Sequence, residues 1–267
     1  MTQRTPHVNS IGRFIRCLVG TALAIAVVGG CSTGDPGVDP TDTGTSEEPA
    51  GNGSGTDPGD ESSDGAVLEL VESAVTVTED STGPMASYAV VVSNPSVDIA
   101  LYTKLEIQLL DGGGDPVVDL DADREVVNRD AHLIMPGQTQ VISNLTYIES
   151  DAVETIDVVL HGTKWAAADD RRFLPLTVDG VSAQADGDGA VVTFTVDSPY
   201  GEKLPTVSTY AIFRDSSGTL LGGSAPIDAD PLSYVPGAND AVIEVSTGVP
   251  PEWDPGSTEV FVDPFVG

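Results

Sequence analysis

The residues whose type and spacing come closest to a chemical site are the acids of DLDADREVVNRD, which begins at Asp119. Asp119, Asp121 and Asp123 alternate with apolar residues, the spacing that opens a calcium-binding loop. The remainder departs from that pattern, because Arg124 stands where such a loop needs glycine and Asp130 stands where a bidentate glutamate closes it. Two interpretations stay open: a Ca²⁺ site built from these three carboxylates, and a solvated acidic loop without a metal.

Residues suited to catalysis do not fall into a recognisable pattern. The sequence contains no G-x-S-x-G, no H-E-x-x-H and no glycine-rich phosphate loop. His132 and His161 lie far from each other and from any cysteine in the sequence. We therefore expect a protein that is not an enzyme and needs no cofactor, with Ca²⁺ as the one alternative. A carboxylate-based secreted hydrolase stays open, because the 42 acids are too numerous to single out a catalytic pair.

The first 31 residues predict the cellular location of the protein. Arg4, Arg13 and Arg16 precede an apolar stretch, residues 18–28, that is too short to span a bilayer and is typical of an export signal. The segment VGGC, which ends at Cys31, resembles the lipobox of prokaryotic lipoproteins. The resemblance implies cleavage after residue 30 and acylation of Cys31, and two acyl chains are enough for stable anchoring. We expect a protein exported and lipid-anchored to the outer face of the cell membrane or within the cell envelope.

The segment 32–64 is expected to be a disordered stalk. It contains nine acids and no Lys, Arg, Leu, Ile or aromatic residue, so it cannot bury enough apolar surface to offset the entropy of ordering. The whole chain has 42 acids against 11 bases and a formal charge of −31. A surface this acidic argues against binding nucleic acid.

From residue 65 onward the pattern predicts an all-β protein. Short β-rich runs alternate with Gly, Asp and Pro turns, and strict alternation puts Leu105, Ile107 and Leu109 on one buried face. The predicted strands are 68–77, 88–92, 101–110, 140–142, 156–160, 174–178, 191–196, 206–214, 241–245 and 260–262.

Two series of strands follow the same pattern. VVSNPS from Val91 aligns with TVDSPY from Thr195, and the same shift aligns Asp111 with Asp215. We interpret this as a tandem duplication of β-sandwich domains, 65–163 and 172–267, joined by the linker 164–171. Each aspartate precedes a turn, where its carboxylate is expected to accept backbone amides two residues on.

The stretch IQLLDGGG, which begins at Ile107, resembles the FxLYD-type domains of prokaryotic envelope lipoproteins. Ile107, Leu109 and Asp111 fall on the first, third and fifth positions of that signature, whereas the second copy keeps only Asp215 and a large apolar residue. The resemblance implies two tandem immunoglobulin-like β-sandwiches and no catalytic residue.

Aromatic residues are the candidates for binding. Trp253 lies in a proline-rich loop, and Trp165 lies in the linker beside Lys164, Arg171 and Arg172. Trp253, Trp165, Tyr200 and Tyr234 would anchor a partner if exposed, or cover the domain cores if buried. The basic residues of the linker would fix the angle between the domains or form a docking patch.

Together these patterns favour a membrane-anchored, surface-displayed binding or scaffolding lipoprotein. Its expected partners are the lipid bilayer, through Cys31, and an envelope or extracellular protein or glycan. The alternatives are a structural spacer or assembly factor and the hydrolase.

Overall fold

The computed structural model of the protein describes residues 67–205, 207–226, 229–230 and 233–265. These residues form antiparallel strands and one short 3-10 turn, η2 (Pro255–Ser257), and no α-helix occurs within the described ranges. The predicted all-β class is therefore confirmed. The expected leader, Cys31 and the stalk lie outside the described residues.

The first half of the described chain forms two sheets. The β2 sheet has the order β1-β2-β6 and consists of β1 (Glu69–Glu79), β2 (Pro84–Ser93) and β6 (Thr139–Tyr147). The β3 sheet is centred on β3 (Ile99–Asp111), with β4 (Pro116–Val117) and β5 (Val126–Ile134) on one edge and β7 (Val153–Leu160) and β8 (Lys164–Ala166) on the other. Tyr88 and Ile142 from the β2 sheet pack with Leu105 and Ile107 from the β3 sheet, so these two sheets share one core.

The second half repeats this arrangement. The β10 sheet has the order β13-β14-β10-β9 and consists of β9 (Thr177–Asp186), β10 (Gly189–Ser198), β13 (Ala229–Asp230) and β14 (Gly237–Val245). The β11 sheet has the order β12-β11-β15 and consists of β11 (Val207–Arg214), β12 (Leu220–Gly223) and β15 (Glu259–Pro264). Phe194 and Ile243 pack against Phe213 in the second core. The pairing of β9, β10 and β14 thus follows that of β1, β2 and β6.

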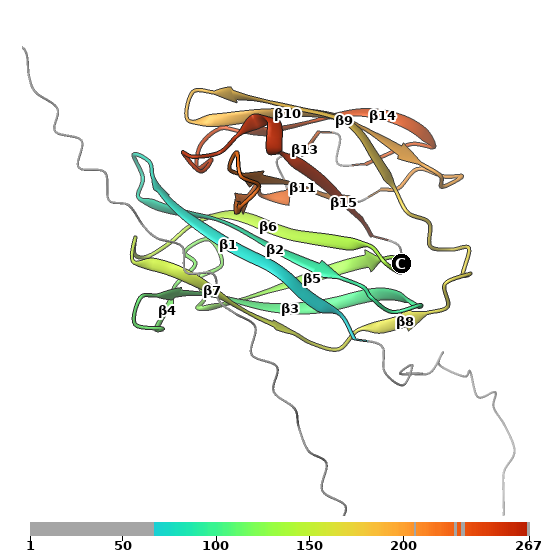
Figure 1. Ribbon diagram of the computed structural model, residues 1–267, viewed down its shortest axis with the longest axis horizontal. Coiled ribbons are helices and arrows are strands. Elements are labelled where there is room, and N and C mark those ends of the chain that lie inside the picture. The colour runs from blue at the N-terminus through green and yellow to red at the C-terminus, as the bar shows by residue number, and fades with distance from the viewer. Residues whose placement is uncertain (1–66, 206, 227–228, 231–232, 266–267) are drawn as a thin grey trace, which may run out of the picture. The chain divides into compact units, whose positions relative to one another are not determined.

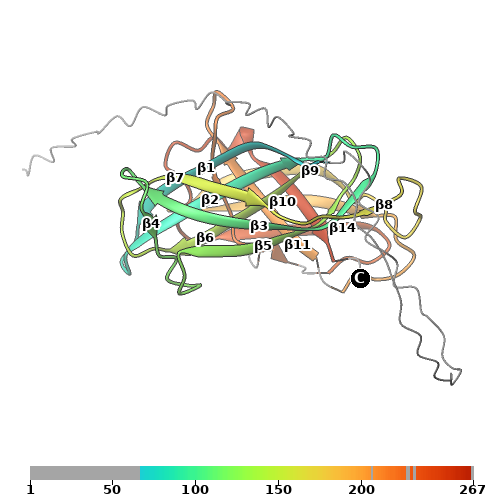
Figure 2. The same ribbon diagram turned by 90° about the horizontal axis from the view of Figure 1, so that it is seen from below.

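The two sheet pairs are stacked on each other. Figure 1 shows four successive layers: the β3 sheet, the β2 sheet, the β11 sheet and the β10 sheet. Figure 2, seen from the β3 side, shows β7 beside β3 in front of the strands of the second pair. The contact between the β2 and β11 sheets, which we call the junction, has its own apolar cluster built from Ala89, Val91, Val141, Tyr210, Ile212 and Leu220.

Several predicted details are confirmed. Leu105, Ile107 and Leu109 are buried on one face of β3. The carboxylate of Asp111 accepts the amide of Gly113 at 2.8 Å, and that of Asp215 accepts the amide of Ser217 at 2.8 Å. Both aspartates therefore close the turns for which the sequence singled them out.

Three boundaries were wrong. Residues 126–130, predicted as part of the acidic loop, begin β5, where Val127 is buried against the core, Arg129 is partly buried and Asp130 is exposed. The strand expected at 174–178 is β9, which runs from Thr177 to Asp186. Residues 164–166, expected in the linker, form β8 and pair with β3.

Candidate functional site

The aromatic residues proposed as binding anchors lie against the hydrophobic cores. Tyr234 is fully buried, and its hydroxyl lies 3.1 Å from that of Thr209. The hydroxyl of Tyr200 donates to the carbonyl of Leu174 at 2.9 Å, and the Tyr200 ring packs on the second core. These tyrosines therefore stabilise the fold of the second sheet pair.

The tryptophans have the same role. Trp253 packs against Phe213 with ring centroids 5.4 Å apart, and its indole nitrogen donates to the Thr258 hydroxyl at 2.9 Å. Trp165, on β8, packs against the core of the first sheet pair. The structure does not bring the four aromatic residues together on one surface, because they belong to two different cores.

The basic residues of the predicted linker do not join the two sheet pairs. Arg172 pairs with the adjacent Asp170, with a nitrogen–oxygen distance of 2.7 Å, and lies over the ring of Phe173. The ammonium of Lys164 lies 5.7 Å from the ring centroid of Tyr102. A cation that does link the pairs is Arg214 on β11.

The acidic residues proposed for calcium lie around one hydroxyl. The Thr146 hydroxyl lies 2.7 Å from Oδ1 of Asp119 and 3.0 Å from Oδ2 of Asp121. Asp123 has a left-handed backbone, with φ of 52°. No group of three or more His, Cys, Asp or Glu side chains suited to a metal occurs in the described part of the chain. The structure thus brings Asp119 and Asp121 together around the Thr146 hydroxyl.

Two cavities bear on the hydrolase alternative. The larger, about 480 Å³, lies on the β10 sheet beside Gly180, Thr193 and Thr195, and Asp240 is its one carboxylate. The smaller, about 190 Å³, lies between the sheet pairs and is lined by residues that include Leu133, Gln140, Leu176 and Val262, with no carboxylate. Neither cavity brings two carboxylates together, as a glycosidase-type mechanism requires.

The junction combines an apolar cluster with hydrogen bonds and an ion pair between the two sheet pairs. Strands β2 and β11 are buried on both faces, because one face of each contributes to its own core and the other to the junction. Along β2, Tyr88 and Val90 face the first core, whereas Ala89 and Val91 face the second sheet pair. Such burial of both faces is unusual for an antiparallel strand, which commonly exposes one face to water.

Glycines of β12 allow the backbones to approach closely at the junction. The hydroxyl of Ser87 donates to the carbonyl of Gly223 and accepts its amide, each at 3.0 Å. The hydroxyl of Ser143 donates to the carbonyl of Ser224 at 2.7 Å. A Cβ on Gly223 would lie 2.5 Å from that of Ser143, so only glycine fits here.

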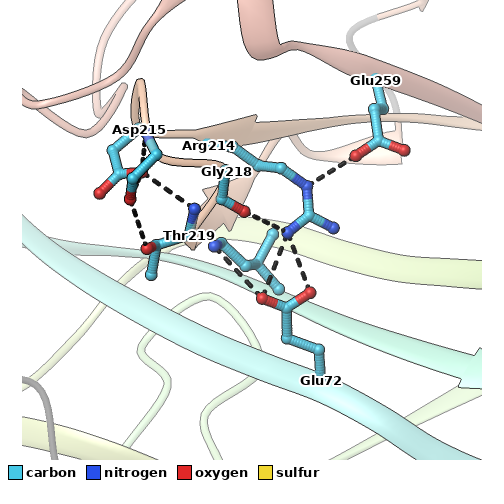
Figure 3. Close-up of polar contacts among 8 residues, drawn as sticks. Glu72, Arg214, Asp215, Gly218, Thr219 and Glu259 are labelled. Carbon is cyan, nitrogen blue, oxygen red and sulfur yellow. Dashed lines mark hydrogen bonds and ion pairs between the residues drawn. The ribbon is translucent and has the colours of Figure 1, made fainter. Parts of the chain in front are cut away.

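Arg214 links the two sheet pairs at one side of the junction. Its guanidinium lies 2.9 Å from Oε2 of Glu72 on β1 and 2.6 Å from Oε1 of Glu259 on β15, as Figure 3 shows. It also donates to the carbonyl of Gly218 at 3.0 Å, in the turn that Asp215 closes. Burial alone would lower the pKa of Arg214. The hydrogen bonds and charges of Glu259 and Glu72 outweigh it, so the pKa of Arg214 is raised.

Asp263 links the two sheet pairs at another side of the junction. Its carboxylate is fully buried and accepts the amides of His132 and Leu133, each at about 3 Å. Nδ1 of His132 lies 2.8 Å from Oδ2 of Asp263. Nearby, the side-chain amide of Gln140 donates to the carbonyl of Val262 at 3.1 Å. These bonds fix the end of β15 against β5 and β6.

The junction residues Glu72, Arg214, Gly223 and Asp263 belong to no motif that stands out in the sequence. The nearest signal is the run MASYAVVV of β2, apolar except for Ser87, which is typical of a strand buried on both faces. That run indicates a covered face but not what covers it.

Comparison of the chain with known protein families gives no match, and comparison with curated proteins gives none either. The part of the chain that the structure describes contains no helix long and apolar enough to cross a membrane.

Proposed function

We propose that this protein is an exported lipoprotein that acts as a non-catalytic binding or scaffolding module of the cell envelope. Acylated Cys31 would hold it at the membrane, and the acidic segment 32–64 would set the distance between the membrane and the folded part. Two tandem immunoglobulin-like sandwiches would then form that part. The repeated strand pairing of the two sheet pairs supports this fold assignment.

The single observation that carries the proposal is the junction. A binding or scaffolding module must present its surfaces at a fixed angle, and flexible domain pairs have small polar contacts. Here an apolar cluster, the close approach of Gly223 to Ser143 and the Arg214 contacts to Glu72 hold the two sheet pairs together. The arrangement suits a rigid block better than two independently moving domains.

A spacer or assembly factor is the second candidate. It is favoured by the placement of Trp165, Trp253, Tyr200 and Tyr234 against cores, because a binding face usually exposes aromatic anchors. Of the exposed large apolar residues, Val67, Leu70 and Val71 lie together at the start of β1, whereas others, such as Val97 and Val159, lie on other segments.

Fractionation of cells that express the full-length chain tests the anchoring. The unchanged chain should enter the membrane fraction and incorporate a labelled fatty acid, whereas Cys31→Ala should lose both. Cys17→Ala is the matched control, because the leader that contains Cys17 would be removed. Equal labelling of both variants, or retention of either chain in the cytoplasm, contradicts the proposal.

Capture of envelope components on the purified full-length chain separates binding from spacing. Saturable retention of one component by the native chain, and not by the heat-unfolded chain, supports binding. Absence of retention at micromolar bait, with and without a calcium chelator, supports the spacer. Hydrolysis of a glycan or ester substrate by the native chain would contradict both.

A further inference from the structure

We propose that His132 and Asp263 form a proton-dependent clamp that holds the C-terminal end of β15 against β5 at one end of the junction. The proposal concerns the contact between the two sheet pairs and does not depend on the proposed function. It assigns a role to the most completely buried carboxylate for which the structure gives an ion-pair partner.

The geometry of the clamp requires an ionised or proton-sharing carboxylate. Asp263 accepts three donors: the amides of His132 and Leu133 and the imidazole of His132. An ionised carboxylate only accepts, so when Asp263 is ionised the Nδ1 atom, 2.8 Å away, carries the hydrogen in this bond. Two successive amides of a strand normally point in opposite directions, and here both reach one side chain from the other sheet pair.

Within the described ranges, His132 is the residue that forms an ion pair with Asp263. Its side chain is 17% exposed, against 0% for Asp263. The other titratable or charged groups around the clamp are Tyr102 on β3, Asp130 on β5, Lys164 on β8 and Tyr210 on β11. Asp130 adds to the field that favours protonated His132, whereas Lys164 faces the ring of Tyr102.

Ring packing positions the imidazole for this contact. His132 lies edge-on to Phe265, with centroids 4.9 Å apart, and to Tyr102, with centroids 5.9 Å apart. Tyr102 has a left-handed backbone with φ of 52°, which is rare for a bulky side chain and places its ring in this cluster. The imidazole is therefore held from both sheet pairs.

The packing beside the clamp is incomplete, which leaves the polar contact to hold this end. The cavity of about 190 Å³ between the pairs is lined by Leu133 next to His132 and by Val262 and Pro264 on either side of Asp263. The two sheet pairs do not pack directly against each other across this cavity. Weakening of the clamp would therefore free the end of β15 more readily than the apolar centre of the junction.

The sign of the pH dependence follows from both groups. Burial opposes protonation of His132, but the hydrogen bond to Asp263 and the charges of Asp263 and Asp130 outweigh it, so the pKa of His132 is raised. Burial also raises the pKa of Asp263, although its bonds to His132 act the other way. Folded His132 binds its proton more tightly than an unfolded histidine, so the clamp loses strength as pH rises from about 6.5 through the pKa of folded His132.

Hydrogen exchange of the full-length chain, corrected for the intrinsic pH dependence of exchange, tests the clamp between pH 5.5 and 8.5. In the unchanged protein, protection of the peptides that cover β15 and the end of β5 should fall by at least a few-fold across this range. His132→Gln should lower that protection at pH 5.5 and abolish its pH dependence. His161→Gln is the matched control, because His161 pairs with Glu106 outside the junction with its side chain 41% exposed.

A second measurement does not depend on a variant that folds. The ring resonances of His132 in the unchanged protein should titrate with a pKa above 6.5, and the β15 amides should shift along the same curve. A pKa of His132 at or below 6.5, or exchange of β15 that does not change with pH, would overturn the proposal. An equal effect of His161→Gln would do so as well.

Discussion

Arg214 and Glu72 lie 142 residues apart in the chain, and their side chains meet at 2.9 Å across the junction. The arginine side chain is 17% exposed and the glutamate 34%, so the pair is partly shielded from water. Glu259 and the carbonyl of Gly218 complete the environment of the guanidinium. One basic residue therefore joins β1, β11, β15 and the turn after β11.

Arg214→Met should destabilise the protein by about 1–2 kcal/mol, because Glu72 and Glu259 would face each other without a cation. Urea unfolding at neutral pH measures the change. Arg172→Met is the control: its side chain is 78% exposed and pairs with its neighbour Asp170, so the effect should be smaller than that of Arg214→Met. Equal effects of the two variants would mean that the junction contact adds nothing.

The part of the fold that could be predicted from the sequence is the part set by local periodicity. Leu105, Ile107 and Leu109 alternate with polar residues, and alternation of period two fixes the buried face of a strand. The turn-closing roles of Asp111 and Asp215 were also predictable, because an Asx turn involves residues only two to four apart in the sequence.

The part that could not be predicted depends on contacts between distant segments. Strand β5 was missed because the charged Arg129 stands on the inward face between Val127 and Ala131 and so breaks the alternation of apolar and polar residues. The roles of Arg214 and Asp263 were missed because their partners, Glu72 and His132, lie more than 100 residues away, and no local pattern indicates such a contact. The aromatic residues were ambiguous, since a tryptophan in a loop serves a binding face and a core edge equally well.

Gly223→Ala should weaken the junction, because the new Cβ would lie 2.5 Å from Cβ of Ser143 and 2.9 Å from the carbonyl oxygen of Ala211. The cost should be about 1–3 kcal/mol, as for other overpacked sites, measured by chemical unfolding. Gly201→Ala is the matched control, since its Cβ would meet no atom within 4 Å. A stable Gly223→Ala variant would show that the two sheets separate without cost.

Trp253→Ala should act on stability. The indole packs against Phe213 and donates to Thr258, so its removal should cost about 2–4 kcal/mol and lower the thermal midpoint. Trp253→Phe keeps most of the ring contact and should recover much of the loss. If Trp253→Ala left the midpoint unchanged and removed retention of an envelope component, the binding interpretation of this residue would be restored.

Asp215 should contribute to stability on the acid side. The hydroxyl of Ser217, with the amides of Thr219 and Ser217, lowers the pKa of Asp215 in the folded state. Its contribution is therefore present above the unfolded pKa of about 3.9 and is lost as pH falls through the lower folded pKa. Asp215→Asn, which still forms the turn, should flatten the decline of the unfolding midpoint below pH 4. Asp169→Asn, in the segment before β9, removes the same charge and should leave the slope unchanged.

Thr146→Val tests whether Asp119 and Asp121 serve as hydrogen-bond acceptors or as ligands of a metal ion. Thr146 is buried, and its single hydroxyl hydrogen serves either Asp119 at 2.7 Å or Asp121 at 3.0 Å. Loss of that hydroxyl leaves Asp119 with the amide of Ala122 and should cost about 1–3 kcal/mol. Because the structural role is carried by hydrogen bonds, Ca²⁺ at millimolar concentration should shift the thermal midpoint of neither the unchanged protein nor the variant. A saturable rise of the midpoint with Ca²⁺, lost in Asp121→Asn, would instead establish a cation at these carboxylates.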